Sequence, residues 1–113
     1  LQDALNKFGV LVDKRQWPGN VFFDVIHGNG AKLLAYNTNS LVYQSFNSAL
    51  RQVRSSDSEL ATETKVIFDL IFVAMALAEG AFNGSKEMTW ERAMRNFRIK
   101  WSENLDEIFS NID

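Results

Sequence analysis

A two-residue turn between two β-rich runs is the strongest constraint on how this chain folds. Asn29 and Gly30 separate the apolar, β-rich runs 21–27 and 31–37. An Asn-Gly pair is the strongest short hairpin signal, because both central residues of a type I′ turn need a positive φ. The sequence therefore predicts an antiparallel hairpin at this point.

The position of the turn also sets the register of the two strands. On the side expected to face the core, the cross-strand pairs are Phe23 with Tyr36 and Val25 with Leu34. The other side pairs Asp24 with Ala35 and Ile26 with Leu33, a mixed surface that we expect to be half covered.

Two further elements are expected before the hairpin. The apolar residues Leu1, Ala4, Leu5 and Phe8 follow the spacing of one helix face, and Gly9 stands where a left-handed cap would end that helix. Residues 10–12 are a candidate strand, followed by a turn at residues 17–20 whose Pro and Gly positions suit type II. A short N-terminal helix and a third strand are the resulting predictions.

After the hairpin the apolar period changes from two to 3.6, which predicts three helices. The first begins after Asn39 or Ser40, the second runs from residues 57–58 to about 83–84, and the third follows Thr89. The predicted fold class is α+β: a short N-terminal helix, an antiparallel hairpin or three-stranded meander, then three helices packed on one face. At 113 residues the chain is expected to be a single globular domain.

The last two helices differ in their apolar pattern. Residues 66–78 are apolar nearly all round, which predicts the central, buried helix; this run contains Asp69 and is too short to cross a bilayer. The last helix has one apolar stripe that we expect to face the core. Its members are Trp90, Met94, Phe97, Trp101, Leu105 and Ile108.

The composition limits the chemistry that this chain can perform. It has no Cys, one His and a net charge of −2, which excludes disulfides and thiolate sites and argues against a strongly electrostatic partner. We expect no metal site, no cofactor and no catalytic residues, because no phosphate loop, nucleophile elbow or zinc pattern is present. His27, at the hairpin tip beside Lys32, is interpreted as a solvated residue.

Two surfaces are candidates for a protein interface. In the helix starting near residue 57, Lys65 and Asp69 share a narrow strip with the small residues Ala76 and Gly80, which would let another helix approach closely. A homodimer built on this strip is one hypothesis, and a solvent-facing stripe is the simpler interpretation. The acidic end of the last helix is the second candidate surface, formed by Glu103, Asp106 and Glu107.

Two other sets of residues fit different functions. A small-molecule pocket between the hairpin and the helices would use Tyr36, Tyr43, Asp69 or Glu79. Basic residues interleaved with aromatics on the last helix would suit RNA, and these nucleic-acid candidates are Arg92, Arg95, Arg98 and Lys100. The arginines spread over the outer surface of the helix beside acidic residues, which weakens the RNA hypothesis.

The sequence favours a non-enzymatic protein-interaction domain of the adaptor, inhibitor or immunity-protein kind, with itself as one potential partner. The alternatives are a small-molecule-binding protein or enzyme, and an RNA-binding module. We expect a soluble protein without a membrane span, and a cytoplasmic location is favoured. Because the chain starts at Leu1, a processed or secreted form is kept as the alternative.

Overall fold

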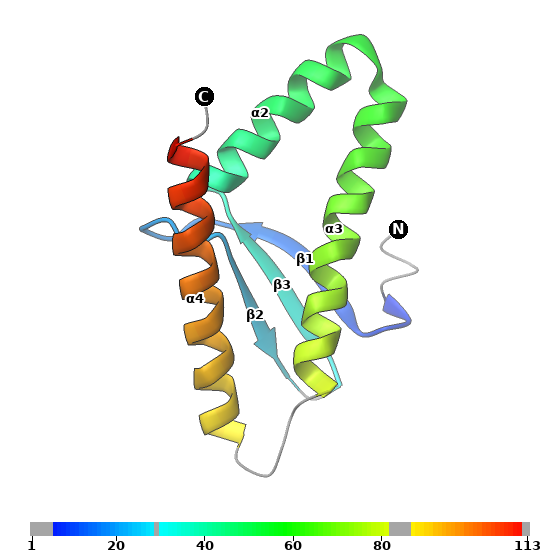
Figure 1. The fold of residues 1–113 in the computed structure, drawn as a ribbon. Coiled ribbons are helices and arrows are strands. Elements are labelled where there is room, and N and C mark those ends of the chain that lie inside the picture. The colour runs from blue at the N-terminus through cyan, green and yellow to red at the C-terminus, as the bar shows by residue number, and fades with distance from the viewer. Residues whose placement is uncertain (1–5, 29, 82–86, 112–113) are drawn as a thin grey trace.

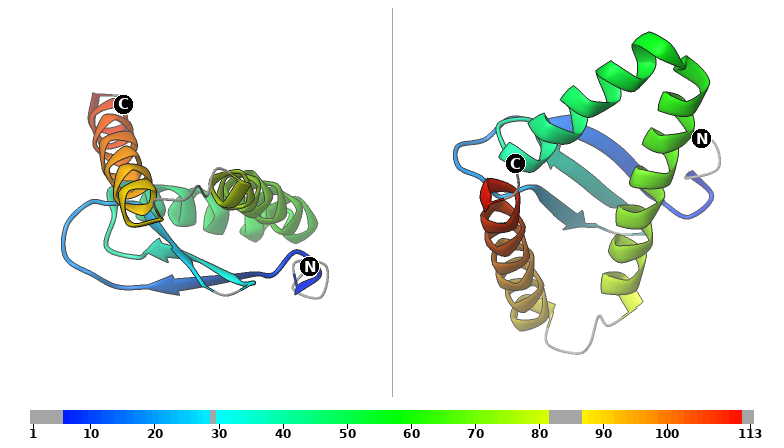
Figure 2. Two further views of the ribbon diagram at one scale, coloured as in Figure 1. Left: turned by 90° about the horizontal axis from the view of Figure 1, so that it is seen from below. Right: turned by 45° about the horizontal axis from the view of Figure 1, so that its top comes forward.

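Three strands and three helices form the described part of the chain, which covers residues 6–28, 30–81 and 87–111 of a computed structural model (Figure 1). The strands are β1 (Val10–Arg15), β2 (Phe23–His27) and β3 (Lys32–Asn37). The helices are α2 (Leu41–Ser56), α3 (Ser58–Ala81) and α4 (Glu87–Asn111). All three helices lie on one side of the sheet, as the view from below shows (Figure 2), which makes this an α+β fold.

The hairpin prediction is confirmed in position and register. Strands β2 and β3 are antiparallel, with Phe23 opposite Tyr36 and Val25 opposite Leu34. Gly28 donates its amide to the Ala31 carbonyl at 2.8 Å. The expected side chains face the core, because Phe23, Val25, Leu34 and Tyr36 are all buried.

The predicted meander is wrong, because the sheet is mixed. Its strand order is β1-β3-β2, and β1 runs parallel to β3 from Val10 opposite Lys32 to Arg15 opposite Asn37. The chain therefore leaves β1, crosses the end of the sheet through residues 16–22, and returns along β2 on the far side. Asn37 holds this crossing, since its buried side-chain amide donates to the carbonyls of Gly19 and Val21.

The short N-terminal helix is also a wrong prediction for the described residues that precede β1. Lys7 to Gly9 form a turn in which the Gly9 amide donates to the Asn6 carbonyl at 3.1 Å, and the element order begins with β1. Phe8, expected on the buried face of that helix, is 62% exposed. Residues 1–5 of the expected helix lie outside the described residues.

Local capping explains where α2 and α3 begin. Ser40 is the N-cap of α2, because its Oγ accepts the Tyr43 amide at 3.1 Å. Asp57 accepts the Leu60 amide at 3.0 Å and so caps α3. The expected cap of the last helix is wrong: α4 already starts at Glu87, and Thr89 lies inside it. The expected end of α3 near residues 83–84 lies outside the described residues.

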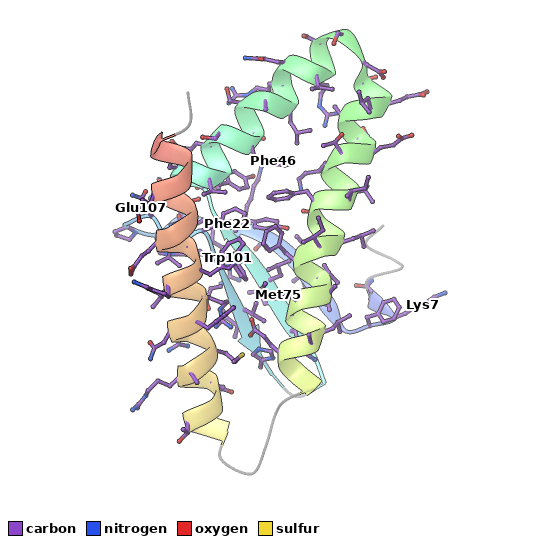
Figure 3. All side chains as sticks on the ribbon, in the orientation of Figure 1. Lys7, Phe22, Phe46, Met75, Trp101 and Glu107 are labelled. Carbon is purple, nitrogen blue, oxygen red and sulfur yellow. The ribbon has the colours of Figure 1, made fainter. Side chains whose placement is uncertain are left out.

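The core is centred on a cluster of aromatic rings between the sheet and the helices (Figure 3). Phe22, just before β2, is fully buried and lies within 6 Å, ring centre to ring centre, of five other aromatic side chains. These neighbours are Phe23, Tyr36, Phe68, Phe72 and Trp101. Residues from β2, β3, α3 and α4 therefore meet at one side chain.

Helix α3 is not the fully buried central helix that its composition predicts. Phe72, Val73 and Ala76 are buried against the core, but Ile67 and Ile71 are about 60% exposed. The helix therefore covers the sheet with one face only. A helix that is apolar all round usually has neighbours all round, and the outer face of α3 has none in the described part of the chain.

Helix α4 turns a different face to the core than its apolar stripe predicts. Trp101 and Met94 are partly buried as expected, but Phe97 is 54% exposed, while Arg98 and Ser102 are buried. The side chains of Trp90, Leu105 and Ile108 lie outside the described residues. The face of α4 that meets the core thus includes the polar residues Arg98 and Ser102, which form hydrogen bonds at the edge of β2.

Candidate functional site

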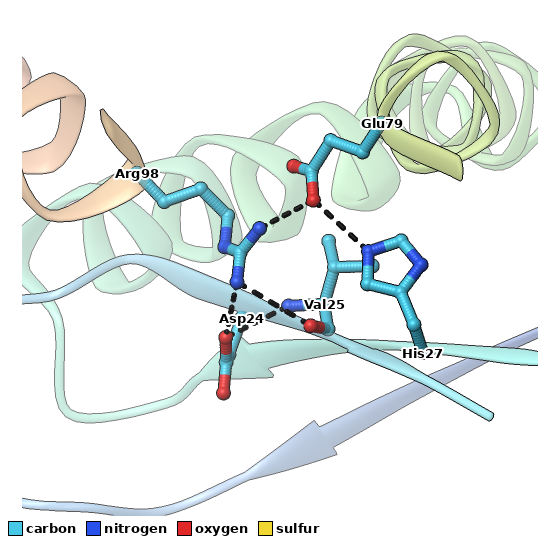
Figure 4. Close-up of polar contacts among 5 residues, drawn as sticks. All are labelled: Asp24, Val25, His27, Glu79 and Arg98. Atoms are coloured by element: carbon cyan, nitrogen blue, oxygen red, sulfur yellow. Dashed lines mark hydrogen bonds and ion pairs between the residues drawn. The ribbon is translucent and has the colours of Figure 1, made fainter. Parts of the chain in front are cut away.

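Four charged or titratable side chains form a buried charge cluster between β2, α3 and α4 (Figure 4). It consists of Asp24 and His27 on β2, Glu79 on α3 and Arg98 on α4. Sequence analysis placed these residues in separate categories: a pocket candidate, an RNA candidate, a solvated hairpin-tip residue and one without a role. The prediction that His27 is solvated is wrong, because its side chain is only 13% exposed and contacts Glu79.

Arg98 is the hub of this cluster. Its Nη1 donates to Oε1 of Glu79 in a short ion pair, and its Nη2 donates to Oδ1 of Asp24 at 3.0 Å. The same Nη2 lies 3.4 Å from the Val25 carbonyl on the free edge of β2. His27 completes the cluster, with its Nε2 at 3.1 Å from Oε1 of Glu79. One guanidinium therefore links a helix, a strand edge and a second helix.

The cluster is sealed from solvent at its centre. Arg98 and Glu79 are 3% and 5% exposed, and the hollow beside His27 measures only about 60 Å³. Oε2 of Glu79 and Nε of Arg98 are buried without a hydrogen-bond partner within the described residues. Such a pair attracts strongly but pays a large desolvation cost. The cluster fixes the positions of β2, α3 and α4 relative to one another. Both carboxylates, Asp24 and Glu79, are already paired with the guanidinium of Arg98.

A second polar group lies between β3 and α3. The Tyr36 hydroxyl donates to Oδ1 of Asp69 at 3.0 Å, and Lys65 reaches both oxygens of the same carboxylate at 2.7 and 2.6 Å. The Lys65 ammonium also lies 5.6 Å from the centre of the Tyr36 ring. Asp69 is only 6% exposed, so the Lys65 charge and the Tyr36 hydroxyl together compensate its burial.

Three of the four pocket candidates therefore come together. Tyr43 joins Tyr36 and Asp69, since its ring centre is 6.0 Å from that of Tyr36. Glu79 belongs instead to the charge cluster. Burial, followed by the charge of Asp69, raises the pKa of both tyrosines, so the two hydroxyls stay protonated through the neutral range.

The raised pKa of Tyr36 makes the stability of the protein sensitive to alkali. An unfolded tyrosine ionises near pH 10, whereas the buried Tyr36 keeps its proton above that pH. The unfolded state then binds fewer protons at this residue, so Tyr36 alone should lower the free energy of unfolding by about 1.4 kcal/mol per pH unit above pH 10. Urea denaturation between pH 9 and 11 measures this slope.

Tyr36→Phe is the matched variant for this prediction. It should be less stable than the wild type at pH 8 by about 1 kcal/mol, because one hydrogen bond is lost. Its stability should decline less steeply above pH 10, since only Tyr43 still contributes through its own raised pKa. Equal slopes for the two proteins would show that Tyr36 is not held protonated by the fold.

Two of the four interface candidates on α3, Asp69 and Ala76, are buried and so cannot reach another molecule. Ala76 is fully buried, Asp69 is 6% exposed, and Lys65 is turned toward Asp69. Gly80 lies within α3, and its exposure is not described. The strip faces the sheet of its own chain, so we do not propose a dimer on it. At the acidic end of α4, Glu103 and Glu107 are exposed, and the side chain of Asp106 is not among those described.

The nucleic-acid candidates on α4 are divided by the structure. Arg92, Arg95 and Lys100 are exposed, whereas Arg98 is buried in the charge cluster. Of the four nucleic-acid candidates, only Arg92, Arg95 and Lys100 are therefore on the surface.

Sequence reasoning missed the feature that the structure makes most evident on the surface, an exposed apolar stripe along α3. It is formed by Leu60, Ile67, Leu70, Ile71 and Ala74. The signal was present in the sequence, since residues 66–78 carry more apolar side chains than one buried face requires. This apolar pattern was interpreted as complete burial of α3, because the sequence of one helix does not show how many other helices pack around it.

Comparison with protein-family models, with curated proteins and with solved structures finds no match for this chain. Across the described residues, none of the helices combines the length and the apolar character that a membrane span requires. The same part of the chain holds no group of three or more His, Asp or Glu side chains that could bind a metal ion.

Proposed function

We propose that this chain is a protein-interaction domain that pairs with a second copy of itself through the outer face of α3. One observation carries the proposal: Ile67, Leu70 and Ile71 are 60%, 43% and 59% exposed on successive turns of one helix. Contiguous exposed apolar residues on a folded domain mark interaction sites more often than single exposed ones do. Leu60, 49% exposed, extends the stripe toward the start of the helix.

The stripe is complementary to itself in an antiparallel arrangement. A two-fold axis beside Leu70 and Ile71 places these two residues opposite each other and sets the large Ile67 against the small Ala74 of the second copy. In the same register Glu63 lies opposite Ala78 of the second copy, so no like charges meet. Large side chains opposite small ones allow two helices to interlock closely.

The inner polar residues support an interaction role over catalysis. Asp69 is engaged by Lys65 and Tyr36, and Glu79 is engaged by Arg98 and His27. Each of these groups serves the fold through a partner of the same chain. The apolar side chains on the outer face of α3, in contrast, have no neighbouring element in the described part of the chain.

The proposal predicts that Ile71→Glu dissociates the dimer. A carboxylate placed at the centre of the stripe would be buried and unpaired in the dimer, which costs several kcal/mol. Sedimentation velocity or light scattering between 10 and about 500 µM should show a concentration-dependent dimer for the wild type and a monomer for the variant. The helical circular-dichroism signal should persist, because Ile71 is exposed in the single chain.

Ile26→Glu is the matched control. Ile26 is 48% exposed on the other side of the sheet, so the same change there should leave the dimer intact. A wild-type chain that stays monomeric over the whole concentration range would refute self-pairing. Equal dissociation by both variants would show that the interface is not the α3 stripe.

A further inference from the structure

A polar groove opens where β1 and β3 end and α2 begins, on a part of the surface separate from the α3 stripe. It has a volume of about 480 Å³. Three basic side chains line it, Lys14 and Arg15 from the end of β1 and Arg51 from α2. Its other lining residues are neutral and polar: Gln16, Thr38, Tyr43, Gln44 and Asn47. None of the described carboxylates lines the groove, although acidic residues outnumber basic ones in the chain, 14 to 12.

The positive charge of this groove is largely uncompensated. Among the described residues, neither Lys14 nor Arg51 forms an ion pair. Arg15 has one partner, Asp13, at 3.5 Å in an exposed pair, and exposed pairs of this kind contribute little. The buried carboxylate of Asp69, whose charge acts on the lining residue Tyr43, is already paired with Lys65. An anion entering the groove would therefore meet a net positive site.

The floor of the groove is held in place by hydrogen bonds from segments distant in sequence. The Thr38 amide donates to the Arg15 carbonyl at 2.8 Å, which joins the ends of β3 and β1. Gln16 donates to the Asn39 side chain at 3.0 Å, and Gln44 donates to the Thr38 carbonyl at 3.2 Å. The positions that carry the basic residues are thus fixed before any ligand arrives, which lowers the entropic cost of binding.

The backbone adds to the attraction for an anion. Strands β1 and β3 are parallel and end at this edge of the sheet, which is where ligands bind in open sheets with parallel strands. Helix α2 starts at the same edge, and its first turn contains no acidic residue. The partial positive charge at its N-terminus is therefore not offset by a side chain of that turn.

We propose that this groove binds a small phosphate-bearing ligand, with Lys14 and Arg51 contacting the phosphate oxygens. Arginine presents donors in a fork that matches phosphate, and lysine adds a point charge. The neutral lining groups are able to donate to and accept from the polar remainder of the ligand. A volume of about 480 Å³ is within the range of small-molecule sites and suits a molecule of mononucleotide size. This site is independent of the proposed dimer.

Calorimetric titration of the full chain with pyrophosphate and with adenosine monophosphate at low ionic strength tests the proposal. Both should bind, adenosine without phosphate should not, and affinity should fall as salt is added. Arg51→Gln and Lys14→Gln should each weaken binding at least threefold, and the double variant at least tenfold. Both side chains lie on the surface, so the variants should keep the circular-dichroism spectrum of the wild type.

Arg92→Gln, at an exposed cation of α4, is the control and should bind both probes as the wild type does. Absence of binding by either phosphate probe would overturn the proposal. An equal loss in Arg92→Gln would also overturn it, because the effect would then reflect total charge alone. Binding restricted to long single-stranded oligonucleotides would assign the surface to nucleic acid instead of a small ligand.

Discussion

Replacing Arg98 with methionine is expected to lower the free energy of unfolding by about 3 to 5 kcal/mol. The side chain is 3% exposed and holds the buried Glu79 carboxylate. Without it, Glu79 would be left as a buried charge with only the His27 ring as a partner among the described residues, which is the costly way to break a buried pair. Urea denaturation at pH 7, read by circular dichroism, measures the loss.

Two further variants identify the cause of that loss. Arg95→Met, three residues earlier on the same helix and exposed, should change stability by less than about 0.5 kcal/mol. Combining Arg98→Met with Glu79→Met should recover much of the stability, because apolar replacement of a whole buried pair is often neutral. A loss below about 1 kcal/mol for Arg98→Met alone would mean that water reaches the pair.

Phe22→Ala should produce a loss of similar size, about 3 to 5 kcal/mol, through a different mechanism. Phe22 is fully buried and contacts aromatic rings from β2, β3, α3 and α4. Its removal leaves a cavity that these rings cannot all fill, because they belong to different elements. The thermal midpoint should fall by well over ten degrees, since each kcal/mol corresponds to roughly 4 to 8 °C in a small domain.

Phe97→Ala makes the same chemical change at a residue that is 54% exposed. It should cost less than about 1 kcal/mol, although the apolar stripe of the last helix predicts a core position for Phe97. A large loss at Phe97 together with a small one at Phe22 would contradict the observed orientation of α4. Calorimetric scans of the two variants beside the wild type provide the comparison.

The elements predicted most accurately are those determined by nearby residues. The hairpin register follows from the Asn29-Gly30 turn alone, and the start of α2 follows from the Ser40 cap. The type II turn before β2 is consistent with the positive φ of 93° at Gly19. Each of these features depends on a few neighbouring residues, so a single sequence contains enough information to predict it.

The arrangement of β1 could not be derived in the same way. A strand that precedes a hairpin usually pairs with the first strand of that hairpin, and nothing in residues 10–15 indicates a parallel neighbour. The observed pairing depends on the crossing at residues 16–22, which is held by Asn37 from the end of β3. Phe22 was missed for the same reason, because both Phe22 and Phe23 are buried and this breaks the alternation of a strand.

The charge cluster was beyond prediction because its members are distant in sequence. Asp24 and Arg98 are separated by 74 residues, and each has an ordinary surface interpretation when considered alone. The apolar period of α4 placed Phe97 inside and Arg98 outside. The structure reverses this because the inner face of α4 lies beside a strand edge, whose buried amide and carbonyl groups need hydrogen-bond partners.

The attachment of α4 to the edge of β2 has a consequence for synthesis of the protein. The Phe22 amide donates to Oγ of Ser102 at 3.2 Å across 80 residues of sequence, and Arg98 covers the Val25 carbonyl. An uncovered strand edge is a template for pairing with other chains. While the chain grows on the ribosome, β2 therefore stays open to such pairing until residue 102 has emerged from the exit tunnel. Helix α4, which follows all the strands in the sequence, is therefore the element that covers this edge of the sheet.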